Sequence, residues 1–306
     1  MEIKKALTFR ASSIGDSLMG KYFIENIRAE YPEARCALAV SSRTGMIRDL
    51  FAAYPWIEVI EVNKNPRALA RVFLSGHNDV VVTPYTGGVF PIAPKIVARL
   101  IARNLVGYTD LSKLNRFLYT KLIHFVGRMR APRLLETDAL KSLDISISIE
   151  HPTFKYIPQP NLLERLGLHT KNYVVLHLFS GSNARGLSPA GKHRLISALS
   201  KTLTVPLVLT GTPKETASLG ELPHTARVAH TNLQELAHLI DNSAGMVSLD
   251  TGAAHIAAHM RKPLIVLASC VGVQWWSPDM YGFDKLTAGG THIPNVLFTR
   301  LDVCTG

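Results

Sequence analysis

The sequence has few cysteines and no long apolar run, and both absences narrow the class of protein. The three cysteines, Cys36, Cys270 and Cys304, are far apart, odd in number and without ligand-like spacing, which favours reduced thiols and no structural zinc. No apolar run approaches the ~20 residues that a helix needs to cross a bilayer. The first residues lack the apolar core of a signal peptide. We therefore expect a cytoplasmic protein.

Acidic residues are also scarce relative to basic ones. The chain has 23 Asp and Glu against 34 Lys and Arg, a net charge of +11, which favours an anionic partner. The basic residues are dispersed, without a basic block or an aromatic RNA-binding signature, so nucleic acid is disfavoured. A phosphorylated substrate and the acidic face of a membrane remain.

What the sequence does contain is an alternation of short apolar runs with helical patterns. At 306 residues, 47% of them hydrophobic, the chain is long enough for two packed domains. Alternating β and α elements of this length predict parallel sheets covered by helices on both faces, in two Rossmann-like, doubly wound domains. The expected strands are 6–9, 36–40, 59–62 and 80–83 in the first half, and 173–178, 205–210, 246–249 and 264–267 in the second. The expected helices are 17–29, 44–53, 67–74, 190–201, 233–241 and 253–259.

The proline-bearing stretch 158–161 is the predicted joint between the two domains. It divides the chain into a first domain, 1–158, and a second domain, 159–306. Ligands in sheets of this kind bind at the carboxyl ends of the strands, where turns lead into helices.

A basic, apolar segment at 114–129 lies between the two series of strands. Arg116 and Lys121 alternate there with aromatic and aliphatic residues, a pattern expected of an amphipathic helix or helix pair. Such a helix could lie on an anionic membrane or face an acidic acceptor. It could equally cover the sheet with a solvated basic side.

The turn after the first expected strand contains Ser13, Gly15 and Asp16. Gly15 would permit a tight turn and the close approach of a ligand. Asp16 would either cap the following helix or act as a base that takes a proton from a hydroxyl nucleophile.

The segment 248–255 is the most informative part of the chain. A strand that ends in Asp250-Thr251-Gly252 and turns directly into a helix leaves backbone N–H groups without intrahelical partners. With the positive end of the helix dipole, these groups suit a phosphate. Thr251 adds a hydroxyl donor, and His255 lies in the first turn. The same pattern also fits an Asp N-cap followed by a glycine turn.

The chain resembles glycosyltransferase family nine, the ADP-heptose:lipopolysaccharide heptosyltransferases. The segments 12–16, 177–182, 210–215 and 248–255 carry this resemblance in their order and spacing, and it covers most of the chain. It implies the GT-B fold, in which two Rossmann-like domains face each other across a cleft. The first domain would bind the acceptor and the second the nucleotide sugar.

The resemblance also implies roles for single residues. Asp16 matches the catalytic base of enzymes that invert the anomeric centre, and Ser13, Gly15, Arg116 and Lys121 would lie on the acceptor side. The positions implied for the donor are Ser182 at the diphosphate, Glu215 at the ribose, and Asp250, Thr251, Gly252 and His255 at the diphosphate turn. Neither a metal nor another cofactor is expected, because a GT-B site of this kind needs no metal and the sequence contains no plausible magnesium-binding cluster; the nucleotide sugar is a co-substrate.

Three departures from the family pattern bear on the identity of the donor. Gly186 stands where the family has a lysine that neutralises the diphosphate, so Arg185, or else Lys192 or Arg194, would supply the charge. The loop 269–278 replaces a Gly-Asp-Pro loop and contains Trp275 and Trp276, which would stack on a ligand or pack inside. The sequence also ends at Gly306 without the long C-terminal helix of many GT-B enzymes.

The resemblance therefore predicts an inverting glycosyltransferase that moves heptose from ADP-heptose to the inner core of lipopolysaccharide. The partners would be the nucleotide sugar, a phosphorylated glycolipid and the cytoplasmic face of the inner membrane, which the protein would contact peripherally. Two alternatives stay open: a relative that uses another nucleotide sugar or acceptor, and a nucleotide-binding relative without catalysis.

Overall fold

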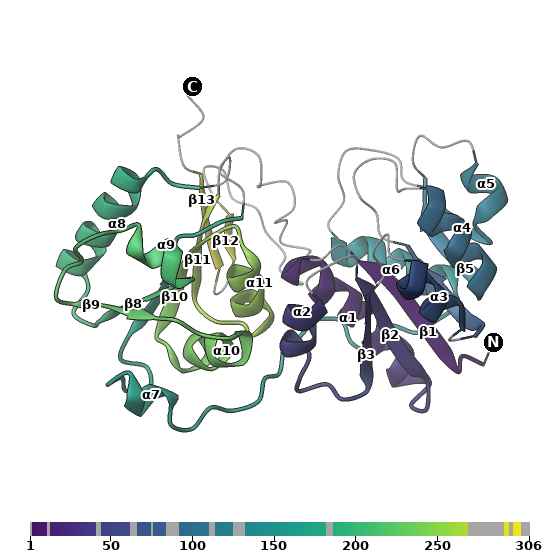
Figure 1. Ribbon diagram of the computed structural model, residues 1–306, viewed down its shortest axis with the longest axis horizontal. Helices are drawn as coiled ribbons and strands as arrows, with labels where there is room; N and C mark the ends of the chain where they lie inside the picture. The colour runs from purple at the N-terminus through teal and green to yellow at the C-terminus, as the bar shows by residue number, and fades with distance from the viewer. Residues whose placement is uncertain are drawn as a thin grey trace. The chain divides into compact units, whose positions relative to one another are not determined.

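The computed structural model divides into two compact units, Met1–Pro152 and Thr153–Gly306 (Figure 1). The sequence predicted a boundary after residue 158, but residues 153–158 belong to the second unit. The Ile157 N–H, for example, donates to Gln234 Oε1 at 2.7 Å. The structure describes residues 2–10, 13–40, 44–61, 66–74, 76–83, 92–109, 114–124, 132–181, 186–268, 291–293 and 296–300.

The described part of the first unit forms a six-stranded parallel sheet in the order β3-β2-β1-β4-β5-β6. The strands are β1 (Lys5–Arg10), β2 (Arg35–Val40), β3 (Ile57–Glu61), β4 (Asn78–Val82), β5 (Ala102–Tyr108) and β6 (Lys121–Ile123). The helices are α1 (Ile14–Glu30), α2 (Thr44–Leu50), α3 (Pro66–Leu74), α4 (Ile92–Ile101), α5 (Asn115–Leu118) and α6 (Pro132–Ser142).

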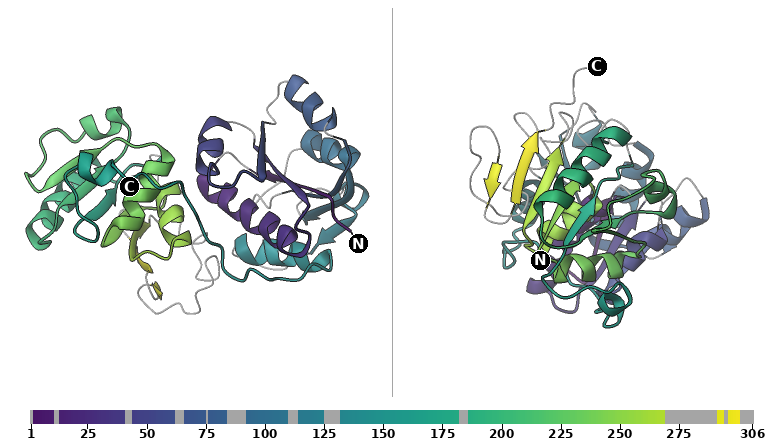
Figure 2. Two further views of the ribbon diagram at one scale, coloured as in Figure 1. Left: turned by 90° about the horizontal axis from the view of Figure 1, so that it is seen from below. Right: turned by 90° about the vertical axis from the view of Figure 1, so that its left-hand side faces the viewer.

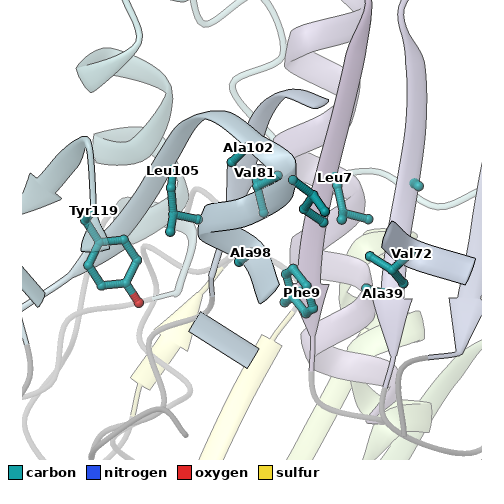
Figure 3. Packing of buried hydrophobic residues seen from close by; sticks show 11 residues of the cluster. Leu7, Phe9, Ala39, Val72, Val81, Ala98, Ala102, Leu105 and Tyr119 are labelled. Carbon is teal, nitrogen blue, oxygen red and sulfur yellow. The ribbon is translucent and has the colours of Figure 1, made fainter. Parts of the chain in front are cut away.

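Alternate residues of β1 point to opposite faces of this sheet. Leu7 and Phe9 pack with Val81 and with Val72 and Ala98 from α3 and α4, in the core shown in Figure 3. The other face, with Thr8 and Arg10, is covered by α1 and α6, which contact each other (Figure 2). Both faces of the sheet are therefore buried, as the near-continuous apolar runs predict.

The described part of the second unit forms a seven-stranded sheet in the order β12-β13-β11-β10-β7-β8-β9. Only the β12–β13 pair among them is antiparallel. The strands are β7 (Val174–His177), β8 (Leu207–Thr210), β9 (Ala226–Ala229), β10 (Gly245–Leu249), β11 (Leu264–Ala268), β12 (Thr291–Ile293) and β13 (Val296–Arg300). The helices are α7 (Leu162–Arg165), α8 (Pro189–Thr202), α9 (Pro213–Ala217), α10 (Leu233–Asn242) and α11 (Gly252–His259).

One face of the second sheet packs against α8. Ile196 of α8 contacts a cluster that includes Leu176, Leu209 and Val247, which come from three adjacent strands. The helix α11 packs against β10, β11 and α10 on the other face (Figure 1). The prediction of two doubly wound parallel-sheet domains is thus confirmed, and each expected strand and helix coincides with an observed one to within a few residues.

The expectation of an amphipathic helix over 114–129 is wrong for the described part of that segment. The helix α5 is only four residues long, and Lys121 begins the edge strand β6, which pairs with β5 from Val106 onward. Thr120 fixes this arrangement, because its Oγ1 accepts from the Leu105 N–H at 2.8 Å. The pairing of β6 with β5 therefore overrides the helical pattern.

Among the residues that the structure describes, no helix is long and apolar enough to cross a membrane.

Candidate functional site

In each sheet the chain returns at one stage to add a strand on the other side of its first strand, which creates a switch point. In the first unit the chain winds outward from β1 through β2 and β3, then returns to add β4 on the other side of β1. In the second unit it winds from β7 through β8 and β9, then returns to add β10 beside β7. Ligands of doubly wound sheets bind at the carboxyl ends of the strands at such switch points. Asp16 follows β1 and the 250–252 turn follows β10, so both lie at switch points.

Ser13 and Asp16 are held together in the first turn of α1. Ser13 is the N-cap residue: its Oγ accepts from the Asp16 N–H at 3.2 Å and donates to Asp16 Oδ2 at 2.6 Å. The prediction that Asp16 could cap this helix is wrong, because a serine three residues earlier already does so. Gly15 is also not the tight-turn residue, since it is the second residue of α1. Asp16 is solvent exposed, so its carboxylate is oriented and accessible to a substrate.

A buried ion pair lies beside this turn and was not predicted from the sequence. Arg10, the last residue of β1, places Nη2 at 2.7 Å from Glu136 Oε1 of α6, and their side chains are only 5% and 3% exposed. Gly20 makes room for Arg10, because a Cβ there would lie 2.7 Å from Arg10 Nε. Burial raises the pKa of Glu136, while the Arg10 guanidinium acts in the opposite direction. Removing one partner of such a pair strands a buried charge and costs about 3–5 kcal/mol.

The turn after β8 holds Glu215 in a capping box at the start of α9. Thr212 is the N-cap, and both its N–H and its hydroxyl donate to Glu215 Oε2 at 2.8 Å. One carboxylate oxygen of Glu215 therefore has a structural role, and its implied contact with the ribose stays a prediction. Gly211 is needed just before this turn, because a Cβ at that position would lie 2.7 Å from the Phe179 ring.

Side chains near the end of β7 include His177 and Phe179, which were given no role from the sequence, and Lys192, one of the cations considered for the diphosphate. Nδ1 of His177 lies 3.0 Å from both the carbonyl oxygen and the hydroxyl of Thr210. Burial lowers the pKa of His177, and the Glu215 carboxylate partly opposes this shift. Lys192 of α8 places Nζ 4.7 Å from the centre of the Phe179 ring. Lys192 is one of the cations considered as a replacement for the family lysine. It contacts Phe179, which lies two residues beyond the end of β7.

The turn after β10 presents the N-terminus of α11. The N-cap residue is Thr251, not Asp250, so the alternative of an Asp N-cap is wrong. The Thr251 side chain makes no capping hydrogen bond with the first turn; its Oγ1 lies 3.3 Å from Ser248 Oγ. Asp250 is buried, whereas Thr251, Gly252 and His255 are partly exposed. Thr251 and the first-turn backbone N–H groups are therefore the parts of this turn that can meet an anion.

The strands β8, β7 and β10 are neighbours, so the turns after them meet at one edge of the second sheet. The structure thereby brings together the predicted donor residues Glu215, Asp250, Thr251, Gly252 and His255. It does not gather all the predicted acceptor residues: β4 and β5 separate β6, which begins with Lys121, from β1. Arg116 is exposed on α5, with its guanidinium over the Phe117 ring at 4.8 Å. Ser182, Arg185, Trp275 and Trp276 lie outside the described residues.

No group of three or more His, Cys, Asp and Glu side chains that could hold a metal ion occurs in the part of the chain that the structure describes.

Comparison with known proteins shows which folds and which family this chain is similar to. Residues 193–268 match the model of glycosyltransferase family 9 (heptosyltransferase). A family 9 glycosyltransferase from Veillonella parvula DSM 2008 is similar in structure, with 14% identity, a TM-score of 0.75, and 98% of this chain and 86% of that chain covered. The E. coli heptosyltransferase WaaC with ADP matches with 17% identity and a TM-score of 0.67, over 97% of this chain and 93% of that one. The E. coli ADP-heptose lps heptosyltransferase II matches with 15% identity and a TM-score of 0.68, over 99% and 91%. No curated protein matches the sequence significantly.

The fold defines the class: this is an α/β protein with two largely parallel sheets and the GT-B-like fold of the heptosyltransferases. The family match concerns part of the second unit: residues 193–268 match glycosyltransferase family 9, in agreement with the resemblance stated from the motifs.

Proposed function

We propose that this enzyme transfers heptose from ADP-heptose to the inner core of lipopolysaccharide, with inversion at the anomeric carbon. The second unit would hold the ADP part of the donor, and the first unit would supply the base. The observation that carries the proposal is the N-terminus of α11 at the switch point of the second sheet, where Thr251 makes no capping bond. Solved structures of WaaC with ADP and with ADP-2-deoxy-2-fluoro heptose support the choice of donor.

We assign a different role to each of the donor residues. The backbone N–H groups of α11 and the hydroxyl of Thr251 would bind the diphosphate, which carries the negative charge that develops as the glycosidic bond breaks. Asp250 is buried beneath the turn, so it would shape the turn from inside, and an acid is favoured electrostatically at a helix N-terminus. Glu215 would accept from the ribose hydroxyls with the carboxylate that Thr212 orients.

Asp16 would act as the base. Its carboxylate takes the proton of the acceptor hydroxyl while the oxygen of that hydroxyl forms a bond to the anomeric carbon. The bond from that carbon to the phosphate oxygen breaks, and ADP leaves with the electron pair. A single displacement of this kind inverts the anomeric centre and needs one base. The hydrogen bond from Ser13 fixes the orientation of the carboxylate before the substrate arrives.

The test is a transfer assay with ADP-heptose and a lipopolysaccharide acceptor that lacks heptose. We expect release of ADP together with a mass increase of one heptose in the glycolipid. Binding of ADP without any transfer would favour the non-catalytic alternative. Because Gly186 replaces the family lysine, the same preparation should be titrated with ADP, UDP and GDP; preferential binding of UDP or GDP would overturn the proposed donor.

A further inference from the structure

An exposed apolar surface runs along α4 and continues onto α5. Ile92, Ile96 and Leu100 of α4 are spaced four residues apart, so they lie along one face of the helix, and they are 47%, 45% and 54% exposed. Leu114 and Phe117 at α5 are 47% and 69% exposed. We call these five residues the α4–α5 surface.

The two helices form one structural element. The buried ammonium group of Lys95 in α4 donates to the Asn115 side chain in α5 at 2.8 Å, and the helices contact each other (Figure 1). The opposite side of α4 is fully occupied, because Ala98 and Ile101 pack into the core of the first unit. The α4 part of the α4–α5 surface is therefore a second apolar face of this helix, separate from the face that packs into the core. Soluble proteins rarely expose several large apolar residues together without a binding role.

The sequence around this surface is rich in cations and poor in acids. Residues 80–134 contain nine lysines and arginines but a single acid, Asp110, in a chain with a net charge of +11. Arg99 of α4 and Arg116 of α5 are exposed on the same two helices as the apolar residues. Large aliphatic side chains interleaved with arginines match a surface that inserts shallowly between anionic lipids.

We infer that the α4–α5 surface docks the enzyme on an anionic lipid bilayer. The aliphatic side chains enter the boundary between headgroups and acyl chains, and the arginines pair with lipid phosphates. The helix in a β-α-β crossover runs opposite to its strands, so α4 begins at the sheet edge that carries Asp16. None of the five residues of the α4–α5 surface is among those proposed for catalysis or for donor binding. The inference goes beyond the proposed function and does not depend on it.

The experiment compares two double variants with matched controls. Ile96→Gln with Leu100→Gln removes apolar area from the surface, and Arg99→Gln with Arg116→Gln removes charge. The controls are Ile157→Gln, which is 45% exposed in the second unit, and Arg35→Gln with Lys201→Gln, which are exposed elsewhere. Each protein is sedimented with vesicles of phosphatidylcholine alone and with vesicles that also contain phosphatidylglycerol. Unchanged ADP affinity and thermal unfolding show that a variant is folded.

We expect the wild type and the controls to bind the phosphatidylglycerol vesicles and not the neutral ones. Loss of two arginines should weaken binding about 25-fold, since each cation near an anionic surface contributes about fivefold. The apolar double variant should weaken binding at high salt, where the electrostatic part is screened. Wild-type binding equal to that of the variants, or no binding to anionic vesicles, would overturn the inference. A wild-type dimer that the apolar variant converts to a monomer, without any lipid binding, would assign the surface to self-association instead.

Discussion

Ser13 donates its hydroxyl proton to Asp16 across 2.6 Å, and Asp16 returns a backbone hydrogen bond to the same oxygen at 3.2 Å. The two residues thus close a small ring at the start of α1, directly after the central strand β1. The ring serves two purposes at once, because it satisfies a first-turn N–H group and fixes the side chain proposed as the base.

Replacing Ser13 with Ala should impair both the capping of α1 and the orientation of Asp16, without affecting donor binding. Loss of an N-cap typically costs about 1 kcal/mol of stability. A carboxylate that is no longer oriented should also lower kcat, while the affinity for ADP stays unchanged because the donor residues belong to the second unit. Urea unfolding, steady-state kinetics and calorimetry with ADP check the three effects. Wild-type kcat in Ser13→Ala would show that the hydroxyl does not orient the base.

The turn after β10 contains one residue proposed to meet the ligand and one proposed to support the turn. Thr251→Val should weaken ADP binding about tenfold or more, through loss of a hydrogen bond to a charged group, with little change in unfolding free energy. Asp250→Ala should lower both, since Asp250 is buried. Calorimetry and thermal unfolding separate the two cases, and an unchanged ADP affinity in Thr251→Val would remove this hydroxyl from the site.

Lys192 is the described cation best placed to replace the missing family lysine, because it already contacts Phe179 beyond the end of β7. Lys192→Gln should weaken ADP binding by about fivefold to tenfold, as expected for one charge-assisted hydrogen bond at a partly exposed site. Lys201→Gln is the matched control, since it changes an exposed lysine near the other end of α8. Equal effects of the two substitutions would show only a general influence of net charge.

His177 should make the stability of the second unit depend on pH. Burial lowers the pKa of His177 below its ordinary value of 6.5, so the unfolded chain binds this proton more readily than the folded protein. The contribution of His177 to stability is therefore complete above pH 6.5 and is lost as the pH falls from 6.5 through the lower folded pKa.

Urea unfolding at about pH 7.5, 6.5 and 5.5 measures this loss. His177→Asn should show a smaller decrease than the wild type over that window, whereas the exposed His169→Asn should behave like the wild type. Identical pH dependence in wild type and His177→Asn would contradict the assignment.

The architecture could be predicted from the sequence because both sheets are built of buried strands, which appear as short apolar runs. β1 and β10 are buried along nearly their whole length. The apolar run of each strand ends in the sequence where the following turn begins in the structure. The segment around Lys121 could not be predicted in this way. Its partner is β5, and the alternation of basic and apolar residues carries no information about a pairing with a strand elsewhere in the chain.

The site was predictable in its motifs but not in the roles of single atoms. The spacing of Ser13 and Asp16 is that of a capping box, yet the sequence alone left the acid as a possible cap. Arg10 with Glu136, and Lys192 with Phe179, join residues that are distant or separated by a loop. Only folding reveals such contacts, because neither partner has a distinctive local pattern.

Asp16→Asn tests the central claim most directly, because it removes the base while keeping the shape of the side chain. Transfer of heptose from ADP-heptose should fall by about 100-fold to 10,000-fold, with an ADP affinity equal to that of the wild type. Transfer at the wild-type rate in Asp16→Asn would contradict the account.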